Sequence, residues 1–117
     1  MRGICCLYPQ RKNLSENIKV ISIIGHFLEH SRIFWFCNND HNEVFIGSAD
    51  WMRRNLDRRI EAIAPIEDSE LKSQLKALLK TYIKDNYFSW IMKEDDSYTK
   101  HALDSVDNRS QIDLIER

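Results

Sequence analysis

Apolar and polar positions in the first half of the chain predict a series of strands. Residues 18–23 are apolar at nearly every position, which is typical of a strand in a sheet covered on both faces. Residues 30–36 are rich in β-branched and aromatic side chains, and a polar turn at 38–42 separates them from the apolar run 44–46. We therefore predict a hairpin from these two runs. Residues 2–7 predict a further buried strand.

Beyond residue 50 the pattern changes to helical spacing. Asp50 is predicted to cap a short helix that runs to Leu56, and residues 60–66 then return as a strand. Asp68 and Ser69 stand where a helix cap belongs. The helix that follows is predicted from an apolar stripe at helical spacing, formed by Leu71, Leu75, Leu78, Leu79 and Tyr82.

The last third of the chain predicts a late hairpin and a polar tail. Residues 87–92 and 97–101 are strand-like runs separated by a charged turn. Residues 102–117 are polar and acidic, so we expect only partial order there. The order of strands and helices predicts an α/β fold, with a mixed central β-sheet and packed helices, over residues 1–101.

Composition narrows the class of protein. The chain has 117 residues and a formal net charge of −1, which suit one domain. Its three cysteines are odd in number and lack C-x-x-C spacing, so we expect reduced thiols and neither a disulfide framework nor a zinc site. No apolar run reaches the length of a membrane-spanning helix, and the first residues lack a signal-peptide pattern. We therefore expect a cytoplasmic protein.

The candidate chemistry centres on His30. Arg32 follows two positions later, on the same face of a strand, and a Gly47-Ser48 turn and a basic run at 53–59 come next. A transferring phosphoryl group carries negative charge on three oxygens. The planar guanidinium of arginine binds such oxygens well, because it can contact two of them at once. An imidazole can in addition give or take a proton at neutral pH. This pattern predicts a site for a transferring phosphoryl group.

Each of these residues also has a simpler interpretation. A histidine at the start of a strand is more often a structural hydrogen-bonding group than a catalyst. Arg53 and Arg58 are best interpreted as a solvated basic face, whereas Arg54 and Arg59 are equally consistent with solvation and with phosphate binding. Acidic residues near this run, such as Glu61, are candidates for orienting the arginines.

Several longer segments of the sequence resemble those of a known family. They are Arg2 to Leu7, Leu14 to Val20, Phe27 to Ile33, Ser48 to Met52 and Arg54 to Glu61. Together they resemble the last domain of bacterial polyphosphate kinase, in the family that works through a phosphohistidine. The resemblance runs from residue 2 to about residue 100. It implies a phospholipase D-like half domain at residues 1–101, one piece of a larger enzyme.

The resemblance implies an activity, which is reversible transfer of the terminal phosphate of ATP to polyphosphate. The phosphorylated histidine would lie in a sister domain that this sequence does not contain, so the chain alone is expected to be inactive. Magnesium is expected, with its ligands outside this chain. The expected partners are ATP, ADP, polyphosphate, the other domains of the kinase and further copies of it, with no nucleic acid and no membrane span. The expected location is the cytoplasm. As part of the full enzyme, peripheral association with the inner membrane is left as an alternative.

Carried over residue by residue, the resemblance assigns roles to several side chains. Arg2 would hold ATP phosphates, His30 would bind the nucleotide and move a proton, and Arg59 would line the phosphate path. Arg32 and Arg54 are further candidates for binding the nucleotide, and we expect these groups to converge on one cavity. Met1 in place of the residue that precedes Arg2 in a full enzyme suggests an expressed fragment or a truncated reading frame.

Departures from the phospholipase D pattern leave two alternatives open. Arg32 takes the lysine position of that pattern, Asp50 takes the asparagine position, and Cys37 stands where an aspartate is required. The first alternative is a phospholipase D-like phosphodiesterase or nuclease that acts as a dimer. The second is a binding module that keeps only a phosphate-binding surface. The departures argue against the first alternative, and the presence of Arg2, His30 and Arg59 argues against the second.

Overall fold

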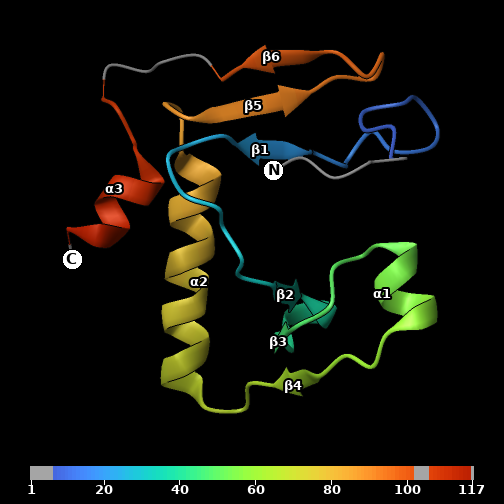
Figure 1. The fold of residues 1–117 in the computed structure, drawn as a ribbon, viewed down its shortest axis with the longest axis vertical. Coiled ribbons are helices and arrows are strands. Elements are labelled where there is room, and N and C mark those ends of the chain that lie inside the picture. The colour runs from blue at the N-terminus through green and yellow to red at the C-terminus, as the bar shows by residue number, and fades with distance from the viewer. Residues whose placement is uncertain (1–6, 102–105, 117) are drawn as a thin grey trace. The chain divides into compact units, whose positions relative to one another are not determined.

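The computed structural model describes residues 7–101 and 106–116, and it confirms the predicted α/β class. The chain divides into two compact units. We call Glu29–Leu78 the central unit, and residues 1–28 together with 79–117 the terminal unit. The strands of the described residues form two three-stranded antiparallel sheets, one in each unit, where the sequence predicted one central sheet (Figure 1).

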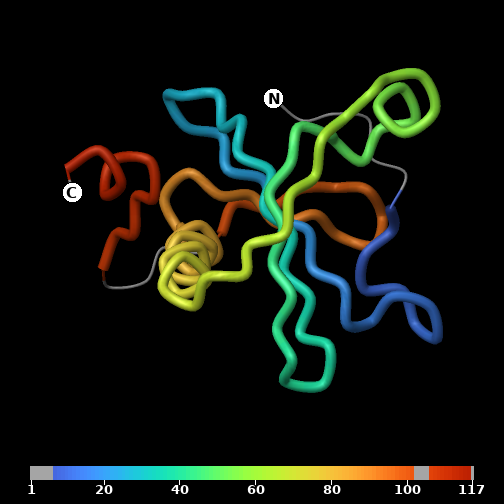
Figure 2. The backbone as a smooth tube through the Cα atoms, turned by 90° about the horizontal axis from the view of Figure 1, so that it is seen from below, coloured from blue at the N-terminus to red at the C-terminus, as the bar shows by residue number. Residues whose placement is uncertain are grey.

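The sheet of the central unit is built on the predicted hairpin. Strands β2 (Ile33–Phe36) and β3 (Glu43–Gly47) pair antiparallel, so the hairpin prediction is confirmed. Figure 2 shows the two strands running side by side toward their turn. The turn contains the short 3-10 element η1 (Asn38–Asp40), where all three residues have positive φ, at 36°, 51° and 69°. Asn and Asp tolerate this left-handed region better than other residues with a Cβ, so they can close the hairpin here.

The third strand and two helices complete the central unit. Strand β4 (Ile63–Pro65) pairs with β3, and helix α1 (Arg53–Arg58) lies between them in the sequence. Helix α2 (Ser69–Lys84) begins in this unit and continues into the terminal unit. Val44 on β3 is only 1% exposed, which places it at the centre of the small core.

The two predicted helix caps have different outcomes. Asp68 accepts a hydrogen bond from the backbone N–H of Leu71 at 2.8 Å, which confirms the predicted cap of α2. The predicted cap by Asp50 is wrong, because α1 begins after Met52 and has no side-chain cap. The carboxylate of Asp50 is bound by Arg32 instead, so it does not reach the helix end.

The terminal unit contains the second sheet. Strand β5 (Ser89–Met92) lies between β1 (Ile21–Ile23) and β6 (Tyr98–Lys100), and both pairings are antiparallel. This confirms the predicted late hairpin. The strand predicted at residues 2–7 falls almost wholly outside the described residues. None of the helices within residues 7–101 and 106–116 is long and apolar enough to cross a membrane.

The end of the chain has more structure than its polar composition predicted. Helix α3 spans Ser110–Ile115, and Ser110 is 1% exposed. The fully buried carboxylate of Asp85 accepts hydrogen bonds from the backbone N–H and the hydroxyl of Ser110, at 2.9 and 2.7 Å. Its other oxygen accepts from the N–H of Phe88 at 2.8 Å. A polar residue thus joins α3 to the unit, which is why an apolar pattern did not indicate this helix.

Gln111 makes a second connection to the terminal unit. Its amide nitrogen donates to the backbone oxygen of Phe27 at 2.8 Å, and its amide oxygen accepts from the N–H of Phe27 at 3.1 Å. Gly25 permits this approach, because a Cβ at that position would collide with the amide of Gln111. The side-chain amide therefore pairs with a backbone peptide as a neighbouring strand would.

Candidate functional site

His30 and Arg32 lie immediately before β2, in an extended segment of the central unit. The sequence predicted that this strand begins at residue 30, whereas the regular strand begins at Ile33. The predicted proximity of the two side chains is nevertheless present. Arg32 Nη1 lies 2.9 Å from His30 Nδ1 and 3.4 Å from Nε2, and it also donates to the backbone oxygen of His30 at 3.1 Å.

Asp50 holds the guanidinium of Arg32 from the other side. Arg32 Nε donates to Oδ1 at 2.7 Å and Nη2 donates to Oδ2 at 3.0 Å, so the pair is bidentate. The side chain of Arg32 is 18% exposed and that of Asp50 is 42% exposed. The Arg32 hydrogen bond lowers the pKa of Asp50 below its ordinary value, and the same bond raises the pKa of Arg32. Both groups are therefore charged at neutral pH.

A second polar cluster fixes the turn that follows β3. Glu61 accepts hydrogen bonds from the hydroxyl of Ser48 and from the amide nitrogen of Asn55, the latter at 2.7 Å. These two bonds are the main reason that the pKa of Glu61 lies below its ordinary value. The hydroxyl of Ser48 also accepts from the N–H of Ala62 at 3.1 Å. The cluster joins the end of β3 to the start of β4, and so supports the segment that carries Asp50.

Asn55 is the most buried member of this cluster. Its residue is 4% exposed, and its amide oxygen is a buried acceptor without a hydrogen-bond partner among the described residues. The sequence predicted that Glu61 orients the arginines. The structure places its carboxylate on Ser48 and Asn55 instead, while Arg59 and Arg32 lower its pKa through their charge.

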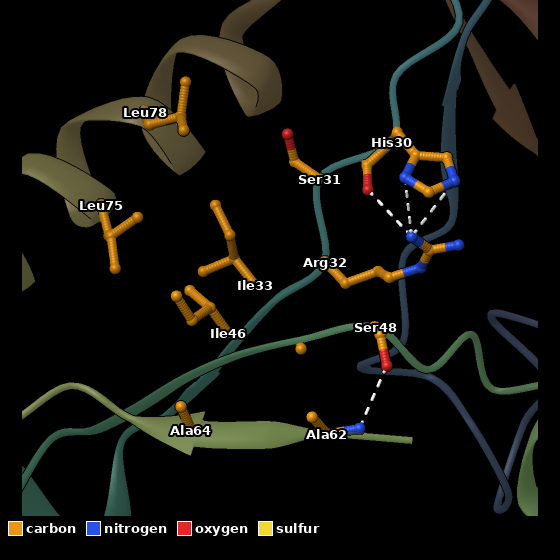
Figure 3. A pocket seen from close by; sticks show the side chains of 11 residues that line it. His30, Ser31, Arg32, Ile33, Ile46, Ser48, Ala62, Ala64, Leu75 and Leu78 are labelled. Atoms are coloured by element: carbon orange, nitrogen blue, oxygen red, sulfur yellow. Dashed lines mark hydrogen bonds between the residues drawn. The ribbon is translucent and has the colours of Figure 1, made fainter. Parts of the chain in front are cut away.

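A cavity of about 640 Å³ opens beside His30 in the central unit. Figure 3 shows the guanidinium of Arg32 turned toward the His30 ring, away from Leu75 and Leu78 of α2. One end of the cavity is therefore polar and the other is apolar. The polar side chains of the lining are His30, Ser31, Arg32 and Ser48, and the apolar ones are Ile33, Ile46, Ala62, Ala64, Leu75 and Leu78.

Of the other predicted site residues, two lie away from this cavity and one lies outside the described residues. Arg54 and Arg59 are exposed and do not line this cavity. Their charges still act on the site, because Arg54 helps lower the pKa of Asp50 and Arg59 helps lower that of Glu61. Arg2 lies outside the described residues, so its predicted convergence with His30 stays a prediction.

The solvated interpretation of Arg53 agrees with its surroundings. Its side chain is 95% exposed and pairs with Asp57, four residues along α1, at 3.0 Å. Such exposed pairs contribute little to stability. This pair is a useful comparison for Arg32 and Asp50, because the same two residue types meet there outside the cavity.

Within residues 7–101 and 106–116, no group of three or more His, Cys, Asp or Glu side chains could hold a metal ion. No residue in the described part of the chain is therefore assigned to magnesium.

Comparison with known proteins identifies the family. The family model described as "Polyphosphate kinase C-terminal domain 2" matches residues 1–111. The chain belongs to this family. The phospholipase D-like α/β fold implied by the sequence is confirmed by a crystal structure of polyphosphate kinase from Porphyromonas gingivalis, which is 38% identical and superposes with a TM-score of 0.88. That match covers 97% of this chain and 18% of the crystallised chain.

Curated relatives carry the same name. The polyphosphate kinase of Prochlorococcus marinus (strain MIT 9313) is 57% identical over 98% of this chain, and that of Parasynechococcus marenigrum (strain WH8102) is 56% identical over 100%. The polyphosphate kinase of Pseudomonas syringae pv. tomato is 43% identical over 100% of the chain. The chain spans only 16–17% of the length of these three relatives.

Proposed function

We propose that this chain is the part of a polyphosphate kinase that supplies His30 to the site of reversible phosphoryl transfer between ATP and polyphosphate. Membership of the family supports the reaction, since the relatives that share the domain are named polyphosphate kinases. The observation that carries the proposal is the position of His30, which lines a cavity beside a guanidinium that is itself held in place. No specific observation favours the phosphodiesterase or the binding module.

The proposed roles follow from the chemistry of each group. His30 is the catalytic residue that contacts the phosphoryl group, while the phosphohistidine lies in another part of the kinase. Arg59 and Arg54 bind the phosphates of the nucleotide or the polyphosphate chain through their exposed guanidinium groups. Arg2 is proposed to hold ATP phosphates, on the family resemblance alone.

The proposal extends to partners that the chain itself does not contain. The site is completed by other domains of the same kinase, the enzyme is a homo-oligomer, and magnesium reaches the site with the nucleotide. No nucleic acid is involved. The proposed location is the cytoplasm, with peripheral association of the full enzyme with the inner membrane. These statements rest on the family, of which this chain represents about one sixth of the length.

The role of His30 can be tested in a complete kinase that contains this chain. His30→Ala is expected to reduce turnover by ~10²-fold or more, as expected when a preorganised hydrogen-bonding or proton-transfer group is removed. Turnover is measured as ATP-dependent synthesis of polyphosphate. His41→Ala is the matched control, because His41 is an exposed histidine just after η1. Near-normal turnover of the His30 variant would remove this residue from the mechanism.

A further inference from the structure

The sheet of the central unit is apolar on both faces. Successive residues of a strand point to opposite faces, and the register pairs Ile33 with Ile46, and Phe34 with Phe45. Ile33 and Ile46 line the cavity together with Leu75 of α2, so their face is directed toward this helix (Figure 3). Phe34 and Phe45 therefore belong to the face that is directed away from α2.

Four aromatic side chains gather on this second face. Phe36 shares it by alternation along β2, and its ring meets that of Phe45 edge to face, with the centroids 6.0 Å apart. Trp51 stacks on Phe34, with the centroids 6.1 Å apart and an angle of 27° between the rings. We call Phe34, Phe36, Phe45 and Trp51 the aromatic face. It extends across β2 and β3 to the segment before α1.

The aromatic face is the more exposed side of this sheet. Phe36 is 45% exposed and Trp51 is 76% exposed, whereas Val44, on the face toward α2, is 1% exposed. An antiparallel sheet with one face in water normally carries polar side chains on that face. Exposed apolar patches of several side chains instead mark surfaces that bind a partner. The exposure of these rings therefore indicates that the face is covered when the protein functions.

We propose that the aromatic face is the surface on which another part of the same kinase packs. This inference rests on the proposed function, in which the chain is one portion of that enzyme. Relatives that match nearly all of this chain are about six times as long, so a complete kinase contains ample further chain to cover the face. The partner contributes an apolar layer of side chains, because that is what four aromatic rings bind.

The charged groups beside the aromatic face permit its burial. Arg32 comes two residues before Phe34 in extended backbone, and therefore lies on the same side of the chain. A buried charge is tolerated when it is paired, and the guanidinium of Arg32 is held by both oxygens of Asp50, at 2.7 and 3.0 Å. Trp51 directly follows Asp50. A partner that covers Trp51 thus approaches Arg32 without leaving it unpaired, and borders the proposed site.

The extent of the aromatic face favours a protein partner over a nucleotide. Phe36 lies six residues beyond His30, which is about 20 Å in extended chain at ~3.3 Å per residue. A nucleotide with its phosphates at His30 would have its base within reach of Trp51 at most, and it would leave Phe36 and Phe45 in water. A second copy of this chain would cover the same rings, so the experiment has to separate it from the rest of the kinase.

Hydroxyl-radical footprinting measures the exposure of single aromatic side chains through their oxidation, which mass spectrometry detects. The 117-residue chain and a complete kinase that contains it are compared at low concentration without nucleotide. We expect oxidation of Trp51 and Phe36 to fall at least several-fold in the complete kinase. Trp35 is the matched control, because it lies between two members of the aromatic face but points to the opposite side, with Lys76 Nζ of α2 5.4 Å from its ring centroid. Its oxidation should be the same in both proteins.

Several results would overturn the proposal. One is unchanged oxidation of Trp51 and Phe36 in the complete kinase, and another is an equal loss at Trp35, which would mean general shielding. Protection of the isolated chain that grows with its concentration would assign the face to a second copy. Protection of the isolated chain by added ATP would assign it to the nucleotide, and protection without either would assign it to the terminal unit.

The footprint is independent of turnover. Failure of the proposed kinase function would appear as normal turnover of His30→Ala, whereas failure of the present proposal would appear in the oxidation of Trp51 and Phe36. The two failures are therefore distinguishable.

Discussion

A single carboxylate, that of Asp50, determines how the charged end of the cavity is arranged. It neutralises Arg32 and fixes the direction of the guanidinium, at distances of 2.7 and 3.0 Å. Arg54 acts on the same carboxylate through its charge, which is a smaller cause of the lowered pKa than the hydrogen bond from Arg32. The position that the phospholipase D pattern gives to an asparagine thus holds an ion-pair partner here.

The lowered pKa of Asp50 predicts a dependence of stability on pH. Because the pKa is lower in the folded chain than the value of about 3.9 for an unfolded Asp, the carboxylate stabilises the fold above that value. This contribution is lost as the pH falls through the folded pKa. The free energy of unfolding of the unsubstituted chain should therefore exceed that of Asp50→Asn at pH 6, and the difference should shrink as the pH falls below about 4.

Urea unfolding at a series of pH values measures this difference. Asp57→Asn serves as the control for the loss of a carboxylate from an exposed ion pair. A difference between the unsubstituted chain and Asp50→Asn that stays constant from pH 6 to acid would contradict the assigned cause of the pKa shift.

The sequence predicted part of this site. The spacing of His30 and Arg32 indicated that they would lie together, and they do. The partner of Arg32 could not be predicted in the same way, because Asp50 is 18 residues away and only the pairing of β2 with β3 brings it close. Its position before a short helix instead suggested a cap, since a local hydrogen bond is the simplest use for an Asp there.

At the scale of elements, local patterns predicted the hairpins and the long helix, and missed the structure that depends on buried polar groups. The stripe on α2 and the cap at Asp68 are signals within a few residues of each other. Helix α3 has no comparable signal. It is held by the carboxylate of Asp85, 25 residues before Ser110 and fully buried, and such a contact leaves no periodic trace in a sequence.

This connection predicts a large effect of a single substitution. Asp85→Ala leaves the N–H groups of Phe88 and Ser110 and the hydroxyl of Ser110 without their acceptor. Each buried donor left without a partner costs about 1–3 kcal/mol, so the free energy of unfolding should fall by at least ~2 kcal/mol. Ser110→Ala removes one hydrogen bond and should cost about 1 kcal/mol.

Chemical denaturation measures both changes, with Asp107→Ala as a control for an exposed aspartate in the same segment. Amide hydrogen exchange supplies a second readout, because the N–H of Ser110 should lose protection in Asp85→Ala. An Asp85 variant as stable as the Asp107 variant would show that the carboxylate does not hold α3.

At the scale of the whole molecule, the chain matches only one part of much longer relatives. Relatives that match nearly all of it are about six times as long. Large apolar side chains are correspondingly open to solvent, as at Trp51, which is 76% exposed, and Leu56, which is 66% exposed. Apolar exposure of this kind is typical of surfaces that contact further protein.

We predict that the isolated chain makes no polymer, because the phosphorylated histidine of the proposed mechanism is elsewhere. Incubation with ATP and Mg²⁺ followed by an assay for long-chain polyphosphate checks this, and a polymeric product would contradict it.

Weak binding of polyphosphate to the isolated chain is expected to remain. Calorimetric titration with polyphosphate should show weaker binding for Arg59→Ala than for Arg53→Ala, since Arg53 is already paired with Asp57.

The pairing of Phe27 with Gln111 has a consequence for how the chain is made. The two residues are 84 positions apart, so the peptide group of Phe27 stays without this partner while most of the chain is being synthesised. The terminal unit can therefore reach its final arrangement only after translation has passed Gln111. Until then, the nascent chain has to depend on water to satisfy that peptide.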